Sequence, residues 1–438
     1  MNTPIQQALH GTYEWTPMPC RLCGNPLSQK FIDLGGSPPS NAYLTPDKLS
    51  QPEITYPLRV MVCDSCWLVQ TEDRVDFHEL FTDTYAYLSS YSDSWLQHCR
   101  AYTSMAVERF GLDSRSHVVE VASNDGYLLQ YFLSKGIPSL GIEPTRLAAE
   151  AATGNGVPTL IRFFEPGLAG ELKSEGKEAD LMIGNNVLAH VPDLNAFLTG
   201  FRILLKPVGT ATFEFPHLLR LIEGLQFDTV YHEHFSYFSL HAVKTALERN
   251  GLELYDVEEL TTHGGSLRIY CQRIDSRPHP VGSAVKSILD EEERQGLLRT
   301  ETYAAFQGRI DTIKNDLLEF LIKQKRIGKT VGGYGAAAKA NTLLNFAGIR
   351  SDLLQFVVDR NPAKIGRFMP GNRIPIVSEK ELVLSKPDFL LLLPWNLRTE
   401  LVEQLGYVID WGGQLVVASP RLSVYNQSGY WMSYPAQP

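Results

Sequence analysis

The stretch Val230–Leu240, which reads VYHEHFSYFSL, gathers two histidines, one glutamate and several aromatic rings. Histidine titrates near neutral pH, so these residues could move protons. A metalloprotease zinc site instead needs H-E-x-x-H on a helix; here His232 and His234 are two positions apart and no further ligand is obvious. Core packing is the other alternative, but burying Tyr231, Glu233 and His234 without polar partners would be costly. We therefore favour proton transfer for this stretch.

Four of the six cysteines form two C-x-x-C pairs, Cys20 with Cys23 and Cys63 with Cys66. Two such pairs suit a tetrahedral zinc ion, because each tight turn presents two thiolates. The gap between the pairs is longer than in a compact zinc ribbon, and a redox role is the alternative, although one pair would serve it. Four thiolates leave no open coordination position, so we expect structural zinc.

Composition limits the class of protein. The chain of 438 residues is long enough for two or three domains, and its net charge of −9 disfavours a protein whose main task is to grip nucleic acid. We see no apolar run typical of a signal peptide and none long enough to cross a bilayer. We therefore expect a cytoplasmic protein that binds neither nucleic acid nor membranes, as a monomer or weak homo-oligomer.

Alternating strand and helix patterns must position these residues. From Ser116 onward, short apolar runs such as HVVEV and ADLMIG alternate with helical spacing, which predicts an α/β fold with a parallel sheet. The charged, proline-free segment 283–326 predicts one or two connecting helices. The alternation then restarts at KTVGGYG, which predicts a second α/β unit.

Two glycine turns follow strands in these units. The first, EVASNDG (Glu120–Gly126), is followed by a strand that ends at Glu143. Ligands bind beyond the carboxyl ends of parallel strands, and an acid there can accept hydrogen bonds from ribose hydroxyls, so we favour an adenosine ligand over a mere helix-cap role for Glu143. The second turn, Gly333–Ala338, is followed by Asp359 and fits the dinucleotide fingerprint. An NAD-dependent oxidoreductase acting on a nucleotide sugar is therefore an alternative, and under either interpretation the turn and Lys339 favour an anion.

The motifs EVASNDG, GIEP and NNVLAHVPDL resemble those of class I S-adenosylmethionine-dependent methyltransferases. Together with the cysteine pairs, YHEHFSYFS, HGGSLR and GYGAAAKANT, they resemble, over nearly the whole chain, the nucleotide-sugar C-methyltransferase family, which includes the sugar C3-methyltransferase of tetronitrose biosynthesis. The resemblance implies a zinc-binding module at 1–75, a class I Rossmann-like methyltransferase domain that binds S-adenosylmethionine at 76–260, and a C-terminal Rossmann-like domain at 261–438 that includes connecting helices and binds the nucleotide sugar.

The resemblance also implies a reaction, C-methylation at C3 of a nucleotide-diphosphate 4-keto-6-deoxy sugar, with dTDP as the expected nucleotide. A base removes the C3 proton that the neighbouring carbonyl acidifies, and donors stabilise the enolate oxygen. Methylation of oxygen or nitrogen is the alternative, and it needs no enolate. The implied catalytic residues are His234 as the base, Glu233 orienting its ring, Tyr231 as a donor, His190 as the second candidate base, and Tyr87, with Tyr85 as its alternate.

The remaining expected site residues bind the cofactor or the substrate. The family turn carries glycine where this chain has Ala122, which is tolerable if the backbone torsions there are ordinary. The expected cofactor-binding residues are Glu120, Ala122, Ser123, Asn124, Gly126, Glu143 and Asn185. The expected substrate-binding residues are Arg268, Gly335, Ala337, Lys339 and Asn341.

Overall fold

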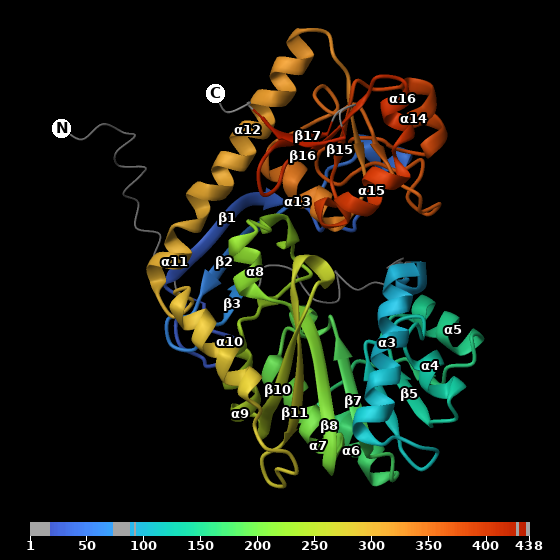
Figure 1. Ribbon diagram of the computed structural model, residues 1–438, viewed down its shortest axis with the longest axis vertical. Coiled ribbons are helices and arrows are strands. Elements are labelled where there is room, and N and C mark those ends of the chain that lie inside the picture. The colour runs from blue at the N-terminus through green and yellow to red at the C-terminus, as the bar shows by residue number, and fades with distance from the viewer. Residues whose placement is uncertain (1–17, 73–87, 92, 426–428, 435–438) are drawn as a thin grey trace, which may run out of the picture.

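The computed structural model describes residues 18–72, 88–91, 93–425 and 429–434 and contains three β-sheets within them (Figure 1). The α/β fold class expected from the sequence is confirmed. In Figure 1 the C-terminal sheet lies at one end of the molecule, the central sheet at the other, and the N-terminal strands to one side near the junction. The predicted zinc ligands lie in the N-terminal part of the chain. The first glycine turn follows a strand of the central sheet, and the second follows a strand of the C-terminal sheet.

The N-terminal sheet is small and antiparallel, in the order β1-β2-β3-β9. Its fourth strand comes from far along the chain, since Val69 pairs with Tyr237 and Gln70 with Ser236. Side chains of β1 and β2 alternate only partly between core and solvent, because β1 carries register shifts after Lys30 and Asp33. The strands are β1 (Gln29–Ser37), β2 (Tyr56–Val62), β3 (Val69–Thr71) and β9 (Ser236–Tyr237), and a 3-10 helix η1 (Pro46–Ser50) lies between β1 and β2.

The central sheet has seven strands in the order β10-β11-β8-β7-β4-β5-β6. The β6, β5, β4, β7 and β8 strands are parallel, and the β10–β11 hairpin adds antiparallel strands at the β8 edge. Buried runs such as VVEV in β4 suit a strand covered on both faces. The strands are β4 (Val118–Val121), β5 (Ser139–Ile142), β6 (Thr159–Leu160), β7 (Ala179–Asn185), β8 (Leu205–Pro216), β10 (Leu252–Leu260) and β11 (Ser266–Arg273).

Helices cover both faces of the central sheet. One apolar cluster joins it to α3, α4 and α5, and another joins it to α6, α7 and α9. Two of these helices begin at capped residues, because Asp193 accepts the N–H of Ala196 and Ser239 accepts that of Ala242. The helices are α3 (Asp93–Phe110), α4 (Leu129–Ser134), α5 (Arg146–Gly154), α6 (Pro166–Ser174), α7 (Leu194–Leu204), α8 (Leu218–Glu223) and α9 (Leu240–Arg249), with 3-10 turns η2 (Ser89–Tyr91), η3 (Leu188–His190), η4 (Phe227–Thr229) and η5 (Thr262–Gly264).

The C-terminal sheet also has seven strands, in the order β14-β13-β12-β15-β16-β17-β18. The first five are parallel, and β17 and β18 are antiparallel. Its strands are β12 (Val331–Tyr334), β13 (Val357–Val358), β14 (Ile376–Val377), β15 (Phe389–Leu392), β16 (Gln414–Val417), β17 (Ser423–Tyr425) and β18 (Trp431–Ser433). Its helices are α13 (Ala338–Phe346), α14 (Glu379–Ser385), α15 (Arg398–Gln404) and α16 (Tyr407–Asp410), with η6 (Trp395–Leu397).

The connecting segment forms three helices, where the sequence predicted one or two. They are α10 (Ser283–Arg294), α11 (Thr300–Ala304) and α12 (Phe306–Arg326). Helix α10 ends just before Gly296, which has φ +84°, and the Leu297 N–H donates to the Glu292 carbonyl. This glycine stop divides the charged segment into separate helices. Long α12 then runs toward the C-terminal sheet (Figure 1).

The N-terminal sheet touches the other two parts. Its strand β3 pairs with β9, whose residues follow those of the central sheet's β8 in the chain. Its strand β1 contacts the helices α11, α12 and α13. The three domain ranges stay a prediction, although the β10–β11 hairpin spans the expected boundary between residues 260 and 261. Among the residues that the structure describes, no helix has the length and apolar character that a membrane span requires.

Candidate active site and zinc centre

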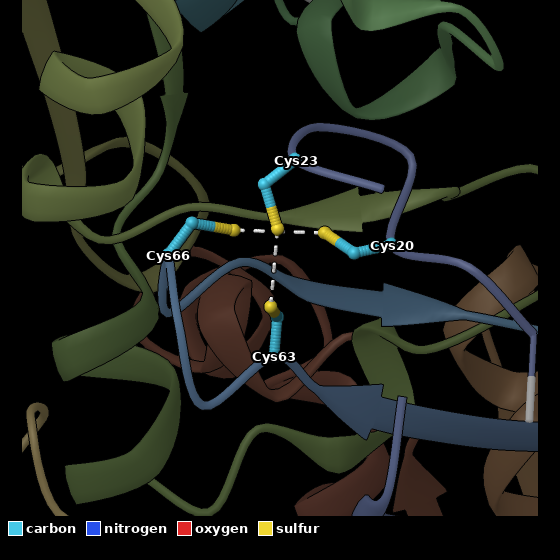
Figure 2. A group of neighbouring side chains, drawn as sticks. All are labelled: Cys20, Cys23, Cys63 and Cys66. Atoms are coloured by element: carbon cyan, nitrogen blue, oxygen red, sulfur yellow. Dashed lines mark hydrogen bonds between the residues drawn. The ribbon is translucent and has the colours of Figure 1, made fainter. Parts of the chain in front are cut away.

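The four predicted zinc ligands converge on one point (Figure 2). Their sulfur atoms all lie within 4.8 Å of one another, and Cys20–Cys66 and Cys23–Cys63 are each separated by 3.5 Å. A tetrahedral zinc with Zn–S bonds of about 2.3 Å would hold its sulfurs about 3.8 Å apart, so the four residues fit the ion closely. The Gln70 side chain donates to the Cys20 sulfur at 3.2 Å and would steady that ligand.

The zinc-binding module holds the stretch in which the candidate catalytic residues lie. Strand β3 begins three residues after Cys66 and pairs with β9, which begins two residues after His234. The Thr71 N–H donates to the Phe235 carbonyl, and the Thr71 hydroxyl donates to the carbonyl of His234 at 3.3 Å. Strand β3 therefore connects the metal site to the backbone of His234.

His234 is held by the backbone, in one tautomer. Its Nδ1 lies 2.8 Å from the Thr229 carbonyl, which can only accept, so Nδ1 carries the proton and Nε2 keeps a lone pair. Burial lowers the pKa of His234 well below its ordinary value, and the charges that His190 and Lys339 would carry lower it further. The imidazole is consequently neutral at pH 7 and able to accept a proton.

Glu233 does not orient the His234 ring, contrary to the role expected from the sequence, because the Thr229 carbonyl does so. The Glu233 carboxylate is buried and accepts hydrogen bonds from the Asn41 amide at 2.8 and 2.7 Å. Its main-chain carbonyl accepts from Nδ1 of His190 at 2.8 Å. Glu233 is thus a junction between the zinc-binding module and His190.

The rings of Tyr231 and Tyr237 and a second imidazole, that of His190, lie around His234. The His190 and His234 ring centres are 4.7 Å apart, and the Tyr231 ring lies 4.0 Å from that of His234. Burial lowers the pKa of His190 to about 4. The structure therefore brings together Tyr231, Glu233, His234 and His190, as the sequence predicted. Tyr85 and Tyr87 lie outside the described residues.

The first glycine turn is conformationally strained. Ala122 has φ +58° and Asn124 has φ +49°, so the backbone torsion at the family's glycine position is not ordinary and the condition for tolerating alanine is not met. A non-glycine residue in this left-handed region costs of order 1–3 kcal/mol. Gly126, with φ +78°, has Val157 so close that a Cβ would lie 2.7 Å from its Cγ2 atom. The turn keeps a shape that glycine would hold more easily.

Buried polar atoms around this turn lack partners among the described residues. They are the Ser123 hydroxyl, Oδ1 of Asp125 and Oδ1 of Asn185. Such orphaned acceptors are rare in folded proteins and indicate a ligand or ordered water. Two of the three are pure acceptors at the carboxyl ends of β4 and β7, which fits a ligand rich in donors, such as the ammonium and hydroxyl groups of S-adenosylmethionine.

The acids of this turn are deeply buried. Glu143 is 4% exposed and accepts from the Asn124 N–H at 3.0 Å and the Thr145 N–H at 2.8 Å, so it braces the turn that it follows. Burial raises the pKa of both Glu143 and Glu120. The side chains of Asn124 and Asp125 also accept hydrogen bonds from the N–H groups of Ser89 and Ser90, which precede α3.

The second glycine turn is shaped by the protein itself. Gly335 has φ +93°, and a Cβ there would lie 2.6 Å from the Pro394 ring. Asp359, which a dinucleotide site would present to ribose, instead accepts the Ala336 N–H at 2.9 Å and the Asn361 N–H at 2.8 Å. The Asp359 carboxylate therefore braces its own turn, as Glu143 braces the first. Ala337 is the residue that precedes α13.

Lys339 extends from the first turn of α13 toward the histidines. Its Nζ lies 4.9 Å from the Trp395 ring centre and donates to Asn396 at 3.2 Å. Burial lowers the pKa of Lys339, and nearby Asp228 opposes that shift. Burial in turn raises the pKa of Asp228 to about 6, and its carboxylate accepts the Trp395 indole N–H at 2.7 Å. The Lys339 charge is close enough to His234 and His263 to lower the pKa of both imidazoles.

Arg268 and Asn341 do not fit their expected substrate roles. Arg268 is buried on β11, paired with Glu214 at 2.8 Å and Glu258 at 2.7 Å, so its charge is already balanced inside the protein. Asn341 is fully buried, and its amide donates to the Ser40 carbonyl at 2.8 Å. Neither side chain is available to a diphosphate.

Sequence reasoning missed His263 and Asn186, which also face this region. Both have positive φ, 53° and 52°, and their ring nitrogen and amide are 3.5 Å apart. Desolvation by neighbouring groups, and then the Lys339 charge, lower the pKa of His263, although the residue stays partly exposed. The HGGSLR motif carries both His263 and Arg268, and its histidine was the available signal.

Three family models match successive parts of the chain. A "Putative zinc binding domain" matches residues 20–81, a "Methyltransferase domain" matches 95–257, and a "C-methyltransferase C-terminal domain" matches 261–420. The curated C-methyltransferase NovU of Streptomyces niveus is 34% identical over 402 residues, which is 92% of this chain and 95% of the relative. The chain belongs to the C-methyltransferase family. The expected enzyme class and cofactors, S-adenosylmethionine and structural zinc, are confirmed at this level.

Two solved structures match the chain at low similarity. The magnesium protoporphyrin IX methyltransferase of Synechocystis PCC 6803 with bound SAM is 14% identical, with a TM-score of 0.32 over 41% of this chain and 79% of that one. The PH0226 protein of Pyrococcus horikoshii OT3 is also 14% identical, with a TM-score of 0.36 over 45% of this chain and 98% of that one.

Proposed function

We propose that this C-methyltransferase methylates C3 of a nucleotide-diphosphate 4-keto-6-deoxy sugar, with dTDP as the nucleotide, through an enolate that His234 generates. The observation that carries the proposal is the fixed tautomer of His234, with Nδ1 donating to Thr229 and a lone pair on Nε2. Carbon next to a carbonyl must lose a proton before it can accept a methyl group, whereas oxygen and nitrogen nucleophiles need no such step. A neutral, oriented imidazole therefore suits C-methylation.

Proton removal alone cannot supply the whole rate. A positioned base contributes roughly 10²–10⁴, and a weak carbon acid also needs stabilisation of the enolate oxygen. Donors aimed at that oxygen contribute about 3–4 kcal/mol each. Tyr231, whose ring lies 4.0 Å from that of His234, is the donor we assign to the sugar oxygens. His190 is the second candidate base, because its ring adjoins that of His234.

The two glycine turns divide the ligands between them. The first turn, with orphaned acceptors at Ser123, Asp125 and Asn185, takes the cofactor. S-adenosylmethionine supplies an electrophilic methyl group there. The start of α13, with its unbonded N–H groups and Lys339, takes the substrate diphosphate. The protein is expected to act as a monomer or weak homo-oligomer in the cytoplasm.

Replacing the base tests the proposal directly. His234→Asn keeps a polar side chain but removes the base, so we expect kcat to fall by roughly 10²–10⁴ while calorimetric affinity for S-adenosylmethionine is unchanged. Wild-type protein should exchange solvent deuterium into C3 of dTDP-4-keto-6-deoxyglucose without cofactor, and the variant should not. Near-normal turnover or exchange in the variant would show that another group is the base.

The acid side of the pH profile supplies a second check. Because burial lowers the pKa of His234, the base stays deprotonated below the 6.5 of an exposed histidine. We expect kcat/KM to stay level as the pH falls through 6.5 and to decline only in more acidic buffer. A decline centred at or above 6.5 would contradict a buried, neutral base.

A further inference from the structure

Asn41 of the zinc-binding module touches the candidate catalytic stretch through its side chain. Asn41 lies 192 residues before Glu233, and its single Nδ2 donates to both carboxylate oxygens, at 2.8 and 2.7 Å. The carboxylate is 98% buried, since Glu233 is 2% exposed. A buried carboxylate is costly without donors, so the Asn41 amide is a substantial part of what keeps Glu233 in place.

Glu233 passes this restraint to the histidines. Its main-chain carbonyl holds Nδ1 of His190 at 2.8 Å, and it directly precedes His234 in the chain. A shift of the Glu233 side chain therefore moves the peptide that orients His190. A displacement of about 1 Å at such a distance from the chemistry can lower a rate by about 10²-fold.

The same short segment also binds the second glycine turn. The Ser40 carbonyl accepts the Asn341 amide at 2.8 Å, and the Tyr43 hydroxyl donates to the Ala336 carbonyl at 2.6 Å. Residues 40–43 thus bind the catalytic stretch and the start of α13 at once. Asn41 is the member of this segment that faces Glu233.

We propose that Asn41 is a positioning residue for methyl transfer, which acts by holding Glu233 and, through its carbonyl, His190. The proposal rests on the proposed function for the identity of the catalytic histidines. It extends the role of the zinc-binding module from folding to catalysis, because the module supplies the donor.

A charge placed at residue 41 would change the pH dependence of activity, whereas a folding defect would not. In Asn41→Asp a carboxylate would face the Glu233 carboxylate at hydrogen-bond distance, and two such groups can hold their positions only by sharing a proton. Activity of this variant should rise as the pH falls from 8 to 6, a range over which wild-type activity is expected to stay level. Asn41→Ala should lose activity by about 10²-fold and show no such rise.

The test measures kcat and KM for dTDP-4-keto-6-deoxyglucose against pH in wild-type, Asn41→Ala, Asn41→Asp and the double variant Asn41→Asp/Glu233→Gln. In the double variant the carboxylate lies on residue 41 and the amide on residue 233, so an amide–carboxylate pair is restored. The rise in activity between pH 8 and 6 should therefore disappear. Asn195→Ala is the matched control, because its amide also joins the central domain to the module, at the Arg21 and Leu22 carbonyls, 3.2 and 3.1 Å away. It should lose stability but keep kcat and the pH profile.

A substrate-independent readout separates the two proposals. The Nδ1–H resonance of His190 should shift in Asn41→Ala and stay in place in Asn195→Ala. Wild-type protein that turns over no 4-keto sugar would overturn the proposed function, while this resonance would still decide the contact with Asn41. An unshifted resonance, or an Asn41→Asp variant whose pH slope matches wild type, would overturn the positioning role.

Discussion

The two glycine turns look alike in sequence but differ in what the protein leaves unsatisfied. Each follows a parallel strand, and each is braced by the acid that ends the next strand, Glu143 or Asp359. Around the first turn, buried oxygens of Ser123, Asp125 and Asn185 have no partner in the described structure. In the second, Pro394 packs against Gly335 and the acid is fully engaged. Of the two turns, the first is the one that keeps buried side-chain oxygens without partners in the described structure, which supports the cofactor site that we propose there.

Removing zinc should separate the turns most strongly. Tyr43 of the zinc-binding module binds the second turn at Ala336, and β3 holds the catalytic stretch, whereas the described contacts of the first turn run to Ser89 and Ser90. We expect chelation to lower methyl transfer by more than about 100-fold while the calorimetric affinity for S-adenosylmethionine changes little. Zinc added back should restore turnover. Equal loss of both properties would contradict the separation.

Exchanging the bracing acids should give the next largest difference. Glu143→Gln removes a charged acceptor from the cofactor site, so the Kd for S-adenosylmethionine should rise roughly 10- to 100-fold. Asp359→Asn is the counterpart in the second turn and should leave that Kd unchanged. Isothermal titration of both variants gives the answer, and equal weakening would mean that the cofactor contacts both turns.

Adding a methyl group to the second turn should destabilise the fold. In Gly335→Ala the new Cβ would come within 2.6 Å of Pro394 at a φ of +93°, so we expect a loss of roughly 2–4 kcal/mol in unfolding free energy. Urea denaturation would measure it. An unchanged midpoint would show that Pro394 yields easily.

The reverse exchange at the first turn should have the smallest effect. Ala122→Gly relieves a strained φ of +58°, worth about 1–3 kcal/mol, but makes the unfolded chain more flexible at a cost of about 0.4–1 kcal/mol, so we expect a net stabilisation of up to about 2 kcal/mol. The same denaturation series would show it. A larger stabilisation would mean that this alanine strains the turn more than its torsion indicates.

Local patterns in the sequence predicted the parts that depend on local spacing. The two cysteine pairs, the alternating strands and the stretch around His234 each lie within a few residues, and the structure contains all of them. The cysteine pairs meet because the first pair precedes β1, the second follows β2, and these two strands form one antiparallel pair.

The other features of the site depend on partners that are distant in the sequence. Arg268 looked like a strand-end cation, but the register of β11 sets it beside Glu214, and no local signal reports a neighbour 54 residues away. The partner of Glu233 is 192 residues distant, and the partner of the His234 ring is a main-chain carbonyl that carries no residue-specific signal. The left-handed torsion at Ala122 was likewise hidden, because alanine rarely adopts it.

Pairing of β3 with β9 also has a consequence for the order in which the protein assembles during synthesis. The N-terminal sheet lacks its last strand until residue 237 has left the ribosome, so the metal-binding end of the chain is made first and completed late. A fragment that stops before Ser236 would expose the edge of β3, with its open N–H and carbonyl groups, to strands of other chains. Shortened versions of this enzyme should therefore aggregate unless they include β9.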